Sequence, residues 1–305
     1  MESANGKLVC FANSKNLELI GLLFEANNRP NTPIIIHIHG NYGNFYNNKF
    51  LWYMSKFYTE NGFAFLSFNL SAHDGLCEGY RNGDLDYIGG GVSDYNESLL
   101  DIDAAIKFVG QRGYNQIILQ GHSLGCDKIL DYILNFDSHE YKIILLSPVD
   151  SYAVQKRWLK IHKNETISEQ IQRLKCLPHS NNTLLDWLDI EEYGAEGLNA
   201  DWIYKIPITK QALLSILQGS AFKYLNLEYN ADFTIDNPAF VFLGKHDGLQ
   251  MSSQKDMRFF LSKHLINCYY EDSLDSDHDI IGVEQELIKA IIFWLQKESF
   301  NNRSD

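Results

Sequence analysis

Short apolar runs alternate along this chain with longer segments in which apolar residues recur at helical spacing. Four of these runs have the length and composition of buried strands: residues 33–39, 63–69, 116–120 and 141–147. Residues 239–243 and 267–271 predict two more strands. This alternation is typical of a mostly parallel sheet that is covered by helices on both faces. The sequence therefore predicts an α/β fold.

Two further runs, residues 7–12 and 17–24, are separated by a short polar stretch and predict an antiparallel hairpin at one edge of the sheet. Helical spacing of Leu99, Ile102, Ile106 and Val109 predicts one helix, and two more are predicted near residues 253–264 and over residues 283–297. The first of these helices would be a right-handed crossover between parallel strands. Asp94 and Glu97 have the spacing of a capping pair at its start.

The alternation of short apolar runs with helical segments stops between residues 151 and 232, where the sequence becomes helical and rich in aromatic residues. We interpret this segment as an inserted helical cap. Residues 1–150 and 233–300 would then form the core, and the polar residues 301–305 would fray.

The composition indicates which partners and locations to expect. Lys and Arg number 26 and Asp and Glu number 39, so the formal charge of the 305 residues is −13, and a nucleic acid would be repelled. The five cysteines are scattered without a CxxC pair, which favours a reducing cytoplasm. Because no apolar run reaches about 18 residues, and no basic flank with an apolar stretch opens the chain, we expect neither a membrane span nor export.

The chemistry centres on Gly121-His122-Ser123-Leu124-Gly125, which follows a predicted strand and precedes a helix-compatible stretch. This is the G-x-S-x-G nucleophile elbow in the strand-turn-helix context that it requires. A sharp turn that places the serine in a strained conformation leaves no space for β-carbons at the flanking glycines. The helix start directs free N–H groups towards the serine oxygen.

With this motif the chain resembles the α/β-hydrolase fold family of serine hydrolases, which includes esterases, thioesterases and serine aminopeptidases. The family requires an acid and then a histidine after the serine. Asp247, in a loop after a predicted strand, and His278, 31 residues later, match these positions. Asp150, after the preceding strand, remains the alternative acid, and His246 is a weaker alternative base.

A second match to the family is His39-Gly40-Asn41-Tyr42-Gly43, which resembles its H-G-x-x-G loop. The resemblance implies that the backbone N–H groups of Asn41 and Leu124 form the oxyanion hole, and that Gly40 and His122 contact the substrate. His37 and His39 alternate on one strand, but no further ligand spacing follows, so we expect neither a metal nor a cofactor. Taken together, the motifs are similar to those of a microbial branch related to fungal siderophore ester hydrolases.

The resemblance implies a serine hydrolase that cleaves an ester, thioester or amide of a small-molecule or carrier-bound acyl substrate through an acyl-Ser123 intermediate. An acyltransferase or a cyclising thioesterase would use the same residues, because only the exclusion of water from the acyl-enzyme separates them. A ligand-binding protein on a hydrolase scaffold is the alternative from another class. The substrate and the oligomeric state stay open.

Overall fold

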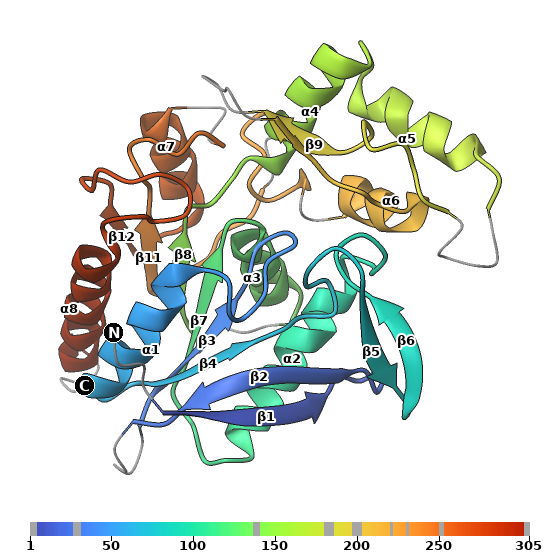
Figure 1. The fold of residues 1–305 in the computed structure, drawn as a ribbon. Helices are drawn as coiled ribbons and strands as arrows, with labels where there is room; N and C mark the ends of the chain where they lie inside the picture. The colour runs from blue at the N-terminus through green and yellow to red at the C-terminus, as the bar shows by residue number, and fades with distance from the viewer. Residues whose placement is uncertain are drawn as a thin grey trace.

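The structure is a computed structural model that describes residues 5–26, 32–136, 141–179, 186–196, 203–219, 222–229, 232–249 and 253–301. Within these residues the main sheet has eight strands (Figure 1). In spatial order they are β1 (Gly6–Ala12), β2 (Glu18–Phe24), β4 (Ala64–Phe68), β3 (Ile34–Ile38), β7 (Ile117–His122), β8 (Lys142–Leu146), β11 (Ala239–Phe242) and β12 (Cys268–Glu271).

The sheet is parallel from β4 to β12, and the two antiparallel pairs are β1 with β2 and β2 with β4. The predicted edge hairpin is confirmed, as are the six predicted strands, with ends that differ by one or two residues. Both β3 and β4 are buried at every position, which explains why they are continuous apolar runs rather than alternating patterns.

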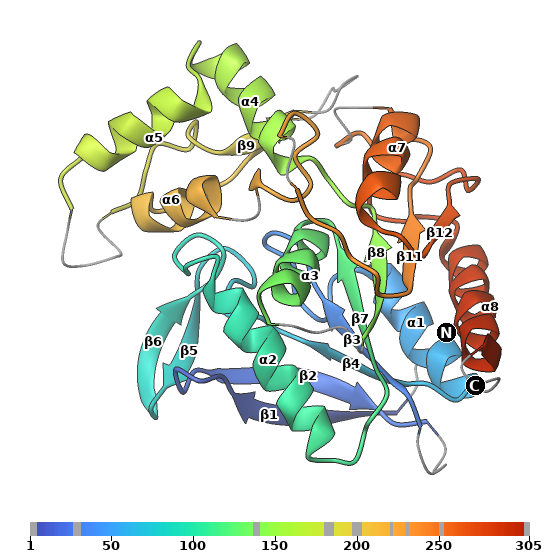
Figure 2. The same cartoon turned by 180° about the vertical axis from the view of Figure 1, so that it is seen from behind.

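Helices cover both faces of the sheet (Figure 2). The helices α2 (Glu97–Gly110), α3 (Leu124–Asn135) and α7 (Gln254–His264) contribute to one apolar core, and α1 (Lys49–Glu60) and α8 (Glu284–Asn301) contribute to the other. The mostly parallel sheet between two helical layers confirms the α/β prediction. The last residues of the predicted frayed tail, 302–305, lie outside the described residues.

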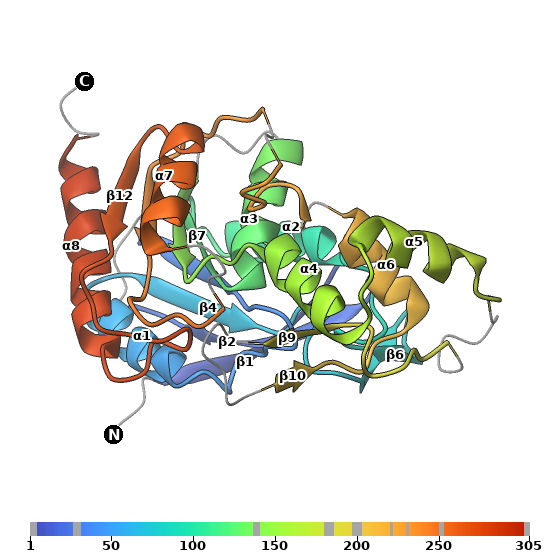
Figure 3. The same ribbon diagram turned by 90° about the horizontal axis from the view of Figure 1, so that it is seen from above.

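The segment between β8 and β11 lies beyond the carboxyl end of β8 (Figures 1 and 3). It contains α4 (Ser151–His162), α5 (Ile167–Cys176), β9 (Gly194–Glu196), β10 (Ile203–Lys205) and α6 (Lys210–Gln218). The segment is thus not purely helical, because β9 and β10 pair as a small antiparallel sheet. The boundaries of the cap stay a prediction.

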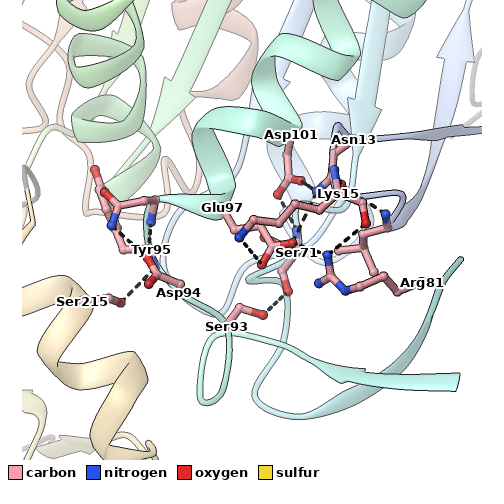
Figure 4. Close-up of polar contacts among 12 residues, drawn as sticks. Asn13, Lys15, Ser71, Arg81, Ser93, Asp94, Tyr95, Glu97, Asp101 and Ser215 are labelled. Atoms are coloured by element: carbon pink, nitrogen blue, oxygen red, sulfur yellow. Dashed lines mark hydrogen bonds and ion pairs between the residues drawn. The ribbon is translucent and has the colours of Figure 1, made fainter.

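The capping pair predicted for α2 is wrong (Figure 4). The residue before α2 is Asn96, whose side chain makes no capping hydrogen bond, and Asp94 accepts hydrogen bonds from Asn96 instead. The Glu97 carboxylate is buried and lies 2.7 Å from Nη1 of Arg81. Because the Glu97 carboxylate pairs with Arg81 on a neighbouring hairpin, it does not cap the start of α2.

That hairpin consists of β5 (Cys77–Arg81) and β6 (Asp84–Ile88), and the strand predictions did not include it. Its turn is Asn82-Gly83, with φ values of 56° and 83°. Positive φ at both turn residues is what a two-residue hairpin of type I′ requires. The Asn-Gly pair was therefore the available sequence signal.

Candidate active site

Ser123 lies between β7 and α3 in a strained backbone conformation, with φ 55° and ψ −127°. A non-glycine residue adopts such a conformation only when its surroundings enforce it. A β-carbon on Gly121 would lie 2.6 Å from the carbonyl carbon of Gly125, and one on Gly125 would lie 2.2 Å from the Ile38 carbonyl oxygen. Both flanking glycines therefore have the steric role that the motif predicts.

The structure joins His278 to Asp247. Nδ1 of His278 lies 2.9 Å from Oδ2 of Asp247, whose side chain is completely buried and whose Oδ1 accepts a hydrogen bond from the Leu249 N–H. The two loops are packed together, since His246 N–H donates to the Ser276 carbonyl and a β-carbon on Gly244 would lie 2.7 Å from the same oxygen. With Nδ1 engaged, Nε2 is the ring nitrogen left for chemistry.

Burial lowers the pKa of His278, whereas the charge of Asp247 and its hydrogen bond raise it. Asp279 and Asp277, which flank the histidine, add to this effect. The net pKa of His278 therefore lies above the ordinary histidine value.

The alternative acid, Asp150, has other partners. It is the N-cap of α4, where Oδ1 accepts from the Ala153 N–H at 2.9 Å and Oδ2 accepts from the Leu227 N–H at 3.0 Å. The alternative base, His246, has an exposed side chain whose Nε2 lies 2.5 Å from Oδ1 of Asp275. Asp247, rather than Asp150, thus contacts His278.

The loop after β3 passes very close to Ser123. A β-carbon on Gly40 would lie 2.8 Å from Cβ of Ser123, so only glycine permits this approach. Asn41 and Leu124 line the same cavity as Ser123, and Leu124 is the first residue of α3, where N–H groups have no partner within the helix. Tyr42, the residue after Asn41, has φ 54°. Its hydroxyl donates a hydrogen bond to the carbonyl of Pro207 in the predicted cap.

Ser123 and His278 open into one cavity of about 580 Å³, a size typical of small-molecule sites. No hydrogen bond joins Ser123 Oγ to the His278 ring in the part of the chain that the structure describes. Four apolar lining residues come from the predicted cap, Val154, Tyr193, Ala195 and Ile206, and three come from the predicted core, Leu124, Val149 and Leu249. Asn48 also lines the cavity, and no sequence signal distinguished it within the asparagine-rich stretch that contains it.

His37 and His39 serve different neighbours. His37 Nδ1 lies 3.0 Å from the Gln120 amide nitrogen, whereas His39 accepts a hydrogen bond from the Leu70 N–H and contacts the Gly40 carbonyl. Burial lowers the pKa of His37 to about 3. Among the described residues, no three His, Cys, Asp or Glu side chains are grouped as ligands for a metal ion.

Over the same described ranges, no helix combines the length and hydrophobicity needed to cross a bilayer.

The sheet order, the helices on both faces and the strained serine between β7 and α3 define the α/β-hydrolase fold. Solved structures agree. The chain matches the Pyrococcus furiosus esterase Pf2001 with a TM-score of 0.59 and 15% identity, over 96% of this chain and 91% of that one. It matches Est1E from Butyrivibrio proteoclasticus with ferulic acid bound, with a TM-score of 0.62 and 16% identity, over 94% and 98% of the two chains.

A third similar structure is DcsB in complex with its substrate analogue, with a TM-score of 0.65 and 11% identity over 96% of this chain and 99% of that one. No protein-family model and no curated protein matches the sequence. At these identities the solved structures establish the fold, and the activity has to be argued from the site.

Proposed function

We propose that the protein is a serine hydrolase that cleaves an ester or thioester, and by the same chemistry an amide, through an acyl-Ser123 intermediate. One observation carries the proposal: a strained serine shares a cavity with a histidine whose far nitrogen is bonded to a buried carboxylate. A serine hydroxyl becomes a nucleophile when a neutral imidazole accepts its proton, and a carboxylate stabilises the resulting cation.

In the first half-reaction, His278 Nε2 accepts the Ser123 proton while Oγ bonds to the substrate carbonyl carbon. The carbonyl oxygen becomes an oxyanion that accepts hydrogen bonds from the Asn41 and Leu124 N–H groups. The bond to the leaving oxygen, sulfur or nitrogen then breaks, and His278 protonates the leaving group. In the proposed mechanism, substrate binding brings Ser123 Oγ and His278 Nε2 into hydrogen-bond contact.

In the second half-reaction, water attacks the acyl carbon. His278 accepts a proton from this water and returns a proton to Ser123 as the acyl group leaves. An alcohol or amine in place of water would give acyl transfer, so the same site can serve that alternative.

The apolar lining contributed by the predicted cap favours an apolar acyl group, on either a free small molecule or a carrier. The esterases among the similar structures, one with bound ferulic acid, support the choice of an ester. A cytoplasmic location stays a prediction from the cysteine pattern.

The test is intact mass after incubation with a fluorophosphonate, followed by a series of acyl esters and thioesters. One phosphonyl group on Ser123 is expected. A folded protein without an adduct would contradict the proposal and favour the ligand-binding alternative. Acyl transfer would be revealed if an added amine or alcohol diverted the product from the free acid.

Activity is expected to rise with pH as His278 loses its proton, because only the neutral ring accepts the serine proton. Since the pKa of His278 is raised, the midpoint of kcat/KM for a neutral ester should lie above about 6.5. Asp279→Asn removes a charge that raises this pKa, and should therefore move the midpoint to lower pH. Asp84→Asn, at the exposed hairpin turn, makes the same charge change elsewhere and should leave the midpoint in place; equal midpoints in all three proteins would contradict the assignment of His278 as the base.

Gly40→Ala is expected to lower kcat/KM about 100-fold, because the new methyl group would displace either the oxyanion loop or Ser123. Gly110→Ala is the control, since a β-carbon there meets nothing within 4 Å. Ester hydrolysis and thermal unfolding should be measured for both variants. Wild-type turnover by Gly40→Ala would show that the close approach has no role in the reaction.

A further inference from the structure

His122 precedes the serine and contacts the backbone of the histidine proposed as the base. Its Nε2 lies 2.9 Å from the His278 carbonyl oxygen, and its Nδ1 lies 3.4 Å from Nδ2 of Asn48. The ring is 4% exposed and packs between the rings of Phe50 and His278, with centroids 5.1 and 5.0 Å away. Both ring nitrogens are thus engaged within the protein.

These contacts determine the tautomer of His122. A carbonyl oxygen only accepts, so Nε2 must carry the hydrogen. Nδ1 then holds a lone pair, which matches the amide donor of Asn48. Burial, together with the charge of His278, lowers the pKa of His122 to about 3, so the ring stays neutral and the tautomer is retained across the working pH range.

The Asn48 side chain does not cap the helix that follows it. Asn48 is the N-cap residue of α1, where asparagine commonly accepts a hydrogen bond from the first turn, yet its side chain makes no such bond. The amide instead reaches His122. The Asn48 amide therefore contacts the His122 ring in the site instead of capping α1.

The loop that carries His278 connects β12 to α8 and has no regular secondary structure. Ile280, completely buried, has φ 62°, a strained value for a β-branched residue. Asp277 Oδ1 accepts from the N–H groups of Asp279 and Ile281. These features fix the loop after the histidine, and the hydrogen bond from His122 fixes the histidine peptide itself.

We infer that Asn48 and His122 are positioning residues for His278: Asn48 donates to Nδ1 of His122 and so supports the tautomer that carries its hydrogen on Nε2, and His122 holds the His278 peptide so that the imidazole stays in the cavity that it shares with Ser123. This inference rests on the proposed function, because it concerns the geometry of the base. It gives His122 a role other than the substrate contact that the motif implied.

The test compares His122→Met with His122→Gln, two side chains of similar length and flexibility of which only glutamine donates a hydrogen bond. His122→Met should lower kcat and the phosphonylation rate of Ser123 by about 10- to 100-fold, with KM within about threefold of wild type. His122→Gln should recover both rates to within about fivefold of wild type. Wild-type rates in His122→Met, or equal losses in both variants, would overturn the inference, since equal losses mean that the lost ring and not the donor matters.

Asn48→Leu provides a second test that leaves the His122 side chain itself unsubstituted. Because the Asn48 side chain does not cap α1, thermal unfolding should be nearly unchanged, while both rates should fall about tenfold. Wild-type rates in this variant would remove Asn48 from the positioning pair. If wild-type Ser123 itself were not phosphonylated, the proposed function would fail, an outcome distinct from a labelled wild type whose variants react equally fast.

Discussion

Ser123→Ala should lower kcat by about 10⁴- to 10⁶-fold, because the hydroxyl is the group that accepts the acyl chain. The substitution removes one oxygen and leaves the β-carbon, so the tight turn between Gly121 and Gly125 keeps its packing. The unfolding temperature should therefore change little. The measurements are kcat on the best ester and thermal unfolding of the purified variant.

A matched control is Ser262→Ala, which removes a hydroxyl from an exposed position on α7. It should turn over the same ester at the wild-type rate. A Ser123→Ala protein that kept a tenth of wild-type activity would exclude Ser123 as the nucleophile, whatever the control showed.

Asp247→Asn should lower kcat by about 10⁴-fold with a nearly isosteric change. The amide no longer supplies the negative charge that stabilises the protonated ring, and it can present a donor to Nδ1 of His278, which favours the wrong tautomer. The variant should also lose the raised pKa of His278, because Asp247 is the main contribution that raises it. Both effects are measured in one pH profile of kcat/KM.

Asp150→Asn is the comparison that separates the two acid candidates. Asparagine can still cap α4, so the loss of rate should stay within about tenfold and the main effect should be on stability. If Asp150→Asn lost several thousandfold while Asp247→Asn stayed near wild type, the acid would belong to the earlier strand.

Much of the fold could be predicted because buried parallel strands are continuous apolar runs. The strands predicted at 33–39 and 141–147 correspond to β3 and β8. The capping pair of α2 was predicted incorrectly, because the partner of Glu97 is Arg81 on a hairpin that was itself missed. A capping motif depends on whether a tertiary ion pair competes for the carboxylate, and local spacing does not contain that information.

The candidate site was predictable in its residue types and less so in its contacts. Chain order and motif spacing indicated Asp247 and His278, but not that Asp247 contacts His278 while both oxygens of Asp150 accept hydrogen bonds elsewhere. The contact of Asn48 with His122 had no signal at all, because it joins residues 74 positions apart through a helix terminus. Such contacts arise from tertiary packing, so the periodicity of the sequence does not predict them.

The hydrogen bond from the Leu227 N–H to Asp150 joins the start of α4 to a residue near the end of the predicted cap. Because these two points of the chain meet, the length between them has little effect on the entropy of closure, since doubling a flexible loop adds only about 0.6 kcal/mol. We therefore expect that the predicted cap can be lengthened, shortened or exchanged without refolding the strands of the core. A different cap inserted between these two residues is expected to change the substrate range while leaving the proposed catalytic residues in place.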